Sequence, residues 1–117
     1  MARLSTHVLD TARGVPAAGV TIALSRLRHG GREAIAAAVT NADGRTDTPL
    51  MQGERLEPGV YELVFQAGDY LRASGAALTD PPFLDEVVVR IGLADPLANY
   101  HVPLLLSPFG YSTYKGS

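Results

Sequence analysis

Two histidines and one arginine have the side chains and surroundings that catalysis would need. His7 and His101 lie in segments that alternate like β-strands, where a rigid backbone can hold an imidazole ready as a general base or acid near neutral pH. Arg45 directly follows the turn residues 41–44, so its guanidinium is expected at the rim of a sheet, where it can bind a planar anion through paired donors. The third histidine, His29, sits in a Gly-rich turn among arginines and is assigned no role.

The rest of the sequence excludes several kinds of chemistry and several kinds of partner. It contains no cysteine, which excludes thiolate nucleophiles, disulfides and thiolate metal sites. No phosphate-binding glycine loop, serine nucleophile elbow or histidine metal motif is present. The net charge of −2 leaves no broad basic surface for nucleic acid. We find neither a signal peptide nor an apolar run of about 18 residues, so we expect a cytoplasmic protein with no membrane partner.

The elements that must position these residues are predicted to be β-strands. A chain of 117 residues with 46% hydrophobic content has the size of a single compact domain, here residues 1–117. Runs of β-branched and aromatic residues recur about every ten positions between turn residues, which is typical of a sandwich or barrel. One short helix is expected after residue 67, with Asp69 as its cap and Pro81 and Pro82 preventing its extension. Eight strands are predicted, at residues 3–9, 20–28, 32–40, 47–50, 60–67, 84–91, 99–106 and 110–115.

Alternation in the first predicted strand separates two faces. Leu4 and Val8 share the face expected to pack in the core, while Arg3, Ser5 and His7 share the opposite face. His7 is therefore expected to point outward.

The strand predicted at residues 99–106 is apolar on both faces. Tyr100 and Val102 share the expected core face, yet Pro103 and Leu105 make the outward face apolar as well, and His101 lies on that outward face. An apolar outer face on a sandwich strand suggests that a second subunit packs there.

The C-terminal segment YSTYKGS has an unusual composition for a chain end. It contains two tyrosines and a Gly-Ser pair, whereas terminal residues are commonly disordered. Composition alone leaves open whether the segment is a disordered tail or part of a site. Gly116 would allow close backbone approach to a ligand, and Ser117 would bring a hydroxyl and the terminal carboxylate.

Four segments together resemble the 5-hydroxyisourate hydrolases, a transthyretin-like enzyme family of purine breakdown. They are LSTHVLDT, NADGRTD, YHVPLLLSP and YSTYKGS, in the order that the family has them. The resemblance implies an all-β, eight-stranded sandwich of two four-stranded sheets with one short helix, assembled as a homotetramer, a dimer of dimers, with active sites where the dimers meet. It implies neither a metal nor an organic cofactor.

The resemblance also implies roles for individual residues. His7, Arg45 and His101 match the family's catalytic residues, and residues 114–117 match its terminal tetrapeptide. Ser117 is thereby implied as a further catalytic residue. The implied substrate-binding residues are His7, Arg45, Tyr114, Lys115, Gly116 and Ser117. Two departures stand out: many relatives have Arg at the position of Lys115, which leaves a bidentate role there open, and many have His at the position of Asn99.

The implied reaction is the hydrolytic opening of one ring of 5-hydroxyisourate, a purine-derived small molecule, on the route from urate to allantoin. The product is 2-oxo-4-hydroxy-4-carboxy-5-ureidoimidazoline. Arg45 would hold the planar ring, one imidazole would deprotonate water, and the other imidazole or the Ser117 hydroxyl would donate a proton as the ring opens. The sequence does not decide which histidine is the base.

Two other functions are compatible with the fold. A transthyretin-like carrier would bind a small hydrophobic ligand, but it has no use for two histidines, an arginine and the tetrapeptide together. A non-catalytic sandwich module of the carboxypeptidase-regulatory type would share the strand and turn segments without a reason to keep the terminal signature.

Overall fold

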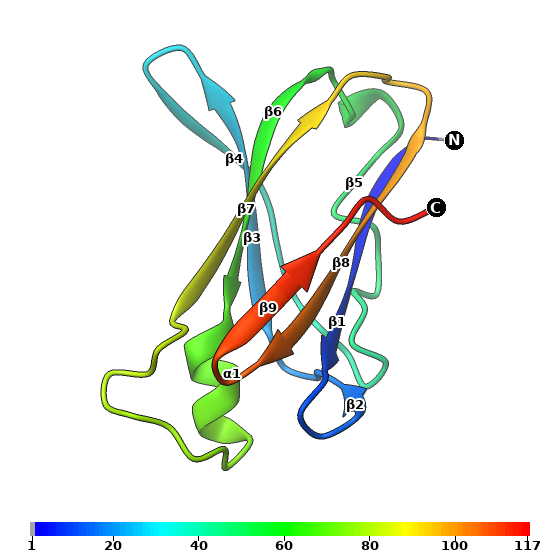
Figure 1. Cartoon of the computed structure of the whole chain (residues 1–117). Helices are drawn as coiled ribbons and strands as arrows, with labels where there is room; N and C mark the ends of the chain where they lie inside the picture. Colours follow the sequence, from blue (N-terminus) through cyan, green and yellow to red (C-terminus); the bar gives the residue numbers. More distant parts are fainter. Residues whose placement is uncertain (1) are drawn as a thin grey trace.

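The computed structural model describes residues 2–117 as two β-sheets packed face to face (Figure 1). The first sheet has the order β2-β1-β8-β9, and β5 also pairs with β1. The second sheet has the order β4-β3-β6-β7. The first sheet contains β1 (Arg3–Asp10), β2 (Val15–Pro16), β5 (Met51–Gln52), β8 (Asn99–Ser107) and β9 (Gly110–Thr113). The second contains β3 (Thr21–Arg28), β4 (Gly31–Val39), β6 (Gly59–Gln66) and β7 (Glu86–Leu93).

The predicted all-β sandwich is confirmed, with two local differences on the free edge of β1. Val15 and Pro16 form the short strand β2 where a loop was expected, so the first sheet has five strands instead of four. The strand expected at residues 47–50 begins only at Met51. Pro49 has no N–H group and cannot donate to a sheet ladder, so pairing starts after it, with the Leu50 amide donating to the Leu4 carbonyl at 2.9 Å.

The core forms between the sheets from the inward positions of the long strands. Leu4 and Val8 of β1, Leu63 and Phe65 of β6 and Leu104 of β8 are each fully buried. Burial of each such side chain stabilises the fold by roughly 1.5–3 kcal/mol. The alternation expected from the sequence is therefore the pattern that holds the outward side chains of β1 and β8 in place.

The one α-helix, α1 (Ala67–Ala73), follows β6, and a 3-10 turn, η1 (Gly53–Arg55), follows β5. The prediction that Asp69 caps α1 is wrong: Gln66 stands at the cap, and Asp69 lies in the first turn, where it pairs with Arg72 at 3.0 Å. The helix ends well before the two prolines, and Gly75 follows with a φ of +80°. From α1, the buried Tyr70 hydroxyl donates to Oδ2 of Asp10 at 2.7 Å and so anchors the end of β1.

The two strands that carry the histidines are neighbours and run parallel. In the register of β1 and β8, Ser5 is opposite His101 and His7 is opposite Pro103. Leu4 and Val8 are buried, and the alternating positions Ser5 and His7 are partly exposed on the outer face of the sheet. The parallel pairing thus places both histidines on one outward surface, as the alternation predicted.

Candidate active site

His101 is held on the outer face of β8 by its neighbour across the ladder. Its Nδ1 lies 2.9 Å from the hydroxyl oxygen of Ser5. Partial burial lowers the pKa of His101 below its ordinary value, and the nearby basic side chains of Arg45, His7 and Arg3 lower it further, against a hydrogen bond at Ser5 that raises it. The imidazole is consequently neutral at neutral pH, and in the tautomer whose Nδ1–H donates to the Ser5 hydroxyl oxygen, Nε2 can accept a proton.

His7 is oriented by a turn that packs against the edge of β1. Its Nε2 lies 2.8 Å from the carbonyl oxygen of Asp43. A carbonyl can only accept, so Nε2 carries the hydrogen and Nδ1 of the neutral ring carries the lone pair. The orientation of His7 therefore depends on the position of that turn.

The turn over residues 41–45 is built by an asparagine and a glycine. Oδ1 of Asn41 accepts from the amides of Asp43 at 2.9 Å and Arg45 at 3.2 Å. Gly44 has a φ of +74°, and a Cβ there would lie 2.3 Å from the Val8 carbonyl oxygen. Glycine is required both for this backbone conformation and for the close approach to β1.

This close approach places Arg45 beside the first histidine. The Val8 amide donates to the Gly44 carbonyl at 2.7 Å, and His7 and Arg45 form an isolated β-bridge. The expectation that Arg45 projects from the rim of a sheet agrees with this position on the edge of β1.

The C-terminal segment continues past β9 alongside β8 (Figure 1). β9 ends at Thr113, two residues before the predicted end of that strand. The Gly116 amide donates to the His101 carbonyl at 2.7 Å, and the two residues form a β-bridge. A Cβ at position 116 would lie 2.7 Å from Cδ2 of His101, so glycine allows the segment to lie directly against the imidazole. The structure therefore places the tail beside His101.

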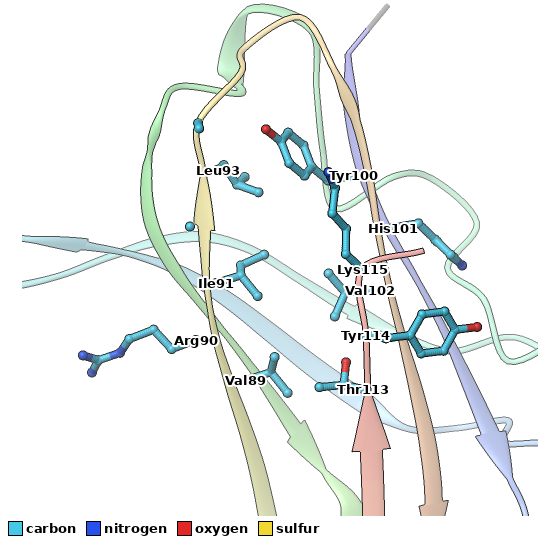
Figure 2. Close-up of a pocket in the computed structure, with 12 residues that line it drawn as sticks. Val89, Arg90, Ile91, Leu93, Tyr100, His101, Val102, Thr113, Tyr114 and Lys115 are labelled. Carbon is cyan, nitrogen blue, oxygen red and sulfur yellow. The ribbon is translucent and has the colours of Figure 1, made fainter. Parts of the chain in front are cut away.

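Neighbouring residues of this segment point in opposite directions. Figure 2 shows Tyr114 on the side to which His101 points, while Lys115 extends toward Tyr100. Nζ of Lys115 lies 5.6 Å from the centroid of the Tyr100 ring, a distance at which a cation and an aromatic face attract each other. Lys115 is thus directed away from the face that carries His101.

A hollow of about 390 Å³ on the outer face brings together three of the four expected catalytic residues, Arg45, His101 and Ser117. This size suits a small heterocycle. It is bordered by Arg3, Ser5, Arg45, Asn99, Tyr100, His101 and Ser117. His7 does not border it and is joined to it through Arg45. The sequence analysis assigned no role to Arg3 or Ser5, although their alternation with His7 already placed them on the same face.

A second and more apolar groove of about 460 Å³ opens between β7 and the β8–β9 pair (Figure 2). Val89, Ile91 and Val102 line it, together with Lys115. The His101 ring points away from this groove and Arg90 points outward (Figure 2). His101 and Arg90 border this groove as well, but neither the imidazole nor the guanidinium is directed into it, so the hollow on the outer face is the candidate active site.

Residues 2–117 contain neither a metal-binding cluster nor a membrane-spanning helix. No group of three or more histidine or acidic side chains in this range is arranged to bind a metal ion. No helix in the same range is long and apolar enough to cross a membrane.

The site combines a neutral imidazole, a guanidinium and hydroxyl groups without a resident metal ligand set. A neutral imidazole can deprotonate a water molecule, and a guanidinium can donate paired hydrogen bonds to carbonyl oxygens along one edge of a planar ring. Backbone bridges hold these groups at His7–Arg45 and His101–Gly116. The arrangement is suited to hydrolysis of a small polar ring by attack of water at one of its carbonyl carbons.

Comparisons with known proteins agree with this chemistry. The model of the HIUase/Transthyretin family matches residues 4–116. The 5-hydroxyisourate hydrolase of Pseudomonas aeruginosa is 56% identical over 117 residues, which are 100% of this chain and 93% of that protein.

Two solved structures have the same fold. That of Klebsiella pneumoniae 5-hydroxyisourate hydrolase has a TM-score of 0.82 and 35% identity, with 100% of each chain covered. That of sea bream transthyretin in complex with thyroxine has a TM-score of 0.86 and 32% identity, covering 97% of this chain and 94% of the other.

Proposed function

We propose that this chain, which belongs to the HIUase/transthyretin family and hydrolyses 5-hydroxyisourate in urate breakdown, carries out that reaction in the hollow on the outer face of β1 and β8. A single transthyretin-like domain over residues 1–117 carries the activity. The observation on which the location rests is the position of His101, whose neutral imidazole lies between Ser5 and the C-terminal segment and borders the same hollow as Arg45.

His101 acts as the general base in this proposal. In the tautomer that acts as the base, Nδ1–H donates to the Ser5 hydroxyl oxygen and Nε2 takes a proton from a water molecule. The resulting hydroxide attacks a ring carbonyl. Arg45 binds the oxygen-rich edge of the planar ring through its paired donors. The Ser117 hydroxyl donates to the nitrogen or oxygen that gains charge as the ring opens.

His7 and the residues next to Ser117 complete the site. His7 donates to the turn that carries Arg45 and, through Nδ1, can take part in proton transfer and substrate binding. Gly116 lets the terminal segment lie against His101, and Tyr114 is on the same side as that ring (Figure 2). No metal or organic cofactor takes part. Among the substrate-binding residues implied by the family resemblance, Lys115 has the least support from the structure, because its side chain extends toward Tyr100.

A homotetramer, a dimer of dimers, is the assembly that we propose. Pro103 and Leu105 follow His101 on the outward positions of β8, and Pro103 is buried while Leu105 is half-buried. A partner subunit packed over this apolar surface would close the hollow against water and strengthen the electrostatic contacts inside it. The cytoplasm is the proposed location.

The carrier function is disfavoured by the polarity of the hollow. The likeness to sea bream transthyretin means that the fold alone cannot separate a carrier from an enzyme. All seven residues that border the hollow are polar, and two of them are arginines. Such a lining suits a ring rich in carbonyl and N–H groups better than an apolar ligand.

The decisive experiment follows the ultraviolet absorbance of 5-hydroxyisourate produced freshly from urate by urate oxidase. Wild-type protein, His101→Ala, His29→Ala and a protein-free sample are compared. His29 lies in the β3–β4 turn and serves as the matched control. We expect wild type and His29→Ala to accelerate the decay equally, and His101→Ala to lose about a hundredfold or more of the activity. Equal activity of folded His101→Ala and wild type would contradict the proposed site.

A further inference from the structure

A second guanidinium group borders the hollow next to Arg45. Arg3 begins β1 on the same outward face as Ser5 and is opposite Asn99 in the β1–β8 register. A smaller hollow of about 200 Å³ is also bordered by Ser5 and by both arginines. Arg3, Ser5 and Arg45 therefore border two depressions of the surface together.

Neither arginine is neutralised by an acidic side chain. Within residues 2–117, the side chains of Arg3 and Arg45 form no ion pair, either with an acidic side chain or with the terminal carboxylate of Ser117, which also borders the hollow. Both positive charges act on His101, since each lowers its pKa. Two unpaired cations beside one hollow repel each other and attract an anion that binds between them.

The hydrolysis itself generates such an anion. Water oxygen forms a bond to the carbonyl carbon of the ring, the ring C–N bond breaks, and the released nitrogen takes a proton. The new carboxylic acid gives up its proton and becomes a carboxylate, with no oxidation or reduction. Negative charge first gathers on the carbonyl oxygen during the attack and ends on the carboxylate, so a donor near that oxygen strengthens its contact as the reaction proceeds.

We propose that Arg3 is a further substrate-contacting residue, which binds the oxygen that becomes the carboxylate while Arg45 holds the rest of the ring. This inference rests on the proposed function and adds a residue outside the set carried over from the family resemblance. The motivating observation is the shared border of Arg3, Arg45 and His101 around one hollow. A contact that strengthens in the transition state predicts a loss in kcat with little change in KM.

The test compares Arg3→Ala, Arg3→Lys and Arg28→Ala with wild type in the absorbance assay. Arg28→Ala removes the same charge from the end of β3, where Arg28 pairs with Glu33, and serves as the matched control. We expect Arg3→Ala to lower kcat about tenfold with KM nearly unchanged. Arg3→Lys should lower kcat by less than Arg3→Ala, because lysine keeps the positive charge. Arg28→Ala should equal wild type. Arg3 is exposed, so circular dichroism and thermal melting should show all variants folded.

The outcomes separate this inference from the proposed function. If Arg3→Ala and Arg28→Ala both match wild type while His101→Ala is inactive, the role of Arg3 is wrong and the site stands. A fall in kcat that is equal for both arginine variants would reduce the effect to net charge and also overturn the inference. A wild type no faster than the protein-free sample would overturn the proposed function itself.

Discussion

The outer faces of the two sheets differ in whether their arginines form ion pairs within the chain. On β6, the carboxylate of Glu62 is 3% exposed although it lies on the outward side, because Arg90 of the neighbouring strand β7 and Arg32 of β4, one strand further across the sheet, each contact it at 2.7 Å. On β1, Arg3 and Arg45 have no such partner among residues 2–117. Each cluster contains two arginines, but only in the Glu62 cluster is a carboxylate ion-paired with both of them.

This difference separates a structural charge cluster from a binding surface. Around Glu62 the ionic interactions are made within the chain, so the cluster contributes to stability and has nothing left to offer a ligand. Around His101 the donors are positioned by backbone bridges, and their side-chain interactions remain to be made by a substrate. Substitutions on the two faces should therefore have separable effects on stability and activity.

After the loss of His101 itself, the largest expected effect on the catalytic face comes from adding a methyl group at Gly116. A methyl group in Gly116→Ala would meet Cδ2 of His101 at 2.7 Å and must displace either the ring or the tail. We expect kcat/KM to fall about ten- to hundredfold, because small displacements of a positioned group have large effects on rate, while the melting temperature changes little. Gly110→Ala is the control, since its Cβ would come no closer than 3.8 Å to Ser107 Oγ. Similar activity of the two variants would contradict the tail contact.

On the other face, Glu62→Gln should change stability alone. The variant leaves Arg32 and Arg90 without their anion, but both arginines are more than half exposed and can turn into water. We expect the free energy of unfolding in urea to fall by about 1–2 kcal/mol and kcat/KM to stay at the wild-type value. Glu33→Gln, which breaks an exposed pair with Arg28, should change stability by less than about 0.5 kcal/mol. A parallel loss of activity in Glu62→Gln would show that the two faces are coupled.

The pH dependence of the reaction reports how Arg3 and Arg45 affect the pKa of His101. Because the pKa of His101 is lowered, its neutral, proton-accepting form persists as the pH falls, and kcat/KM should decrease only below pH 6.5. Arg3→Gln removes one of the cations that lower this pKa, so the inflection should move toward higher pH. The measurement is a pH-rate profile of both proteins. An inflection above pH 7 in wild type would exclude His101 as the base.

The smallest effect is expected at Lys115. Its contact with the Tyr100 ring lies on the inner side of the tail, so Lys115→Ala should loosen the tail without removing a group from the hollow. An exposed cation–π contact contributes about 0.5–1 kcal/mol, which corresponds to a two- to fivefold loss of kcat/KM. Lys115→Arg keeps the contact and should equal wild type. A loss in Lys115→Ala as large as that in Gly116→Ala would indicate direct substrate contact instead.

The sequence predicted the strands and the outward face well because side-chain alternation is a local property. The positions of His7 and His101 followed from counting residues in β1 and β8. The edge of β1 was less predictable: β2 is a two-residue strand that turns back locally onto the end of β1, and the late start of β5 depends on pairing with the start of β1, far away in the sequence. The cap of α1 was misassigned because Asp69 fits both a cap and a first turn.

The composition of the hollow could not be obtained from the sequence alone. Arg3 and Ser5 alternate with His7, but only the parallel register to β8 shows that Ser5 is opposite His101. The direction of Lys115 likewise depends on the bridge between Gly116 and His101, which fixes which residues of the tail face outward. Strand pairing across the chain, and not local pattern, decides these contacts.

The hydrogen bond between Ser5 and His101 joins residues 96 positions apart, and the whole β1–β8 ladder has the same separation. Closing so long a loop has a high entropic cost before any contact compensates it, and topologies of high contact order fold slowly. The local hairpin of β3 and β4 can form without the two ends of the chain meeting. During refolding from urea, recovery of enzymatic activity should therefore lag behind recovery of the β-sheet signal in circular dichroism, since the active site forms at the last junction to close.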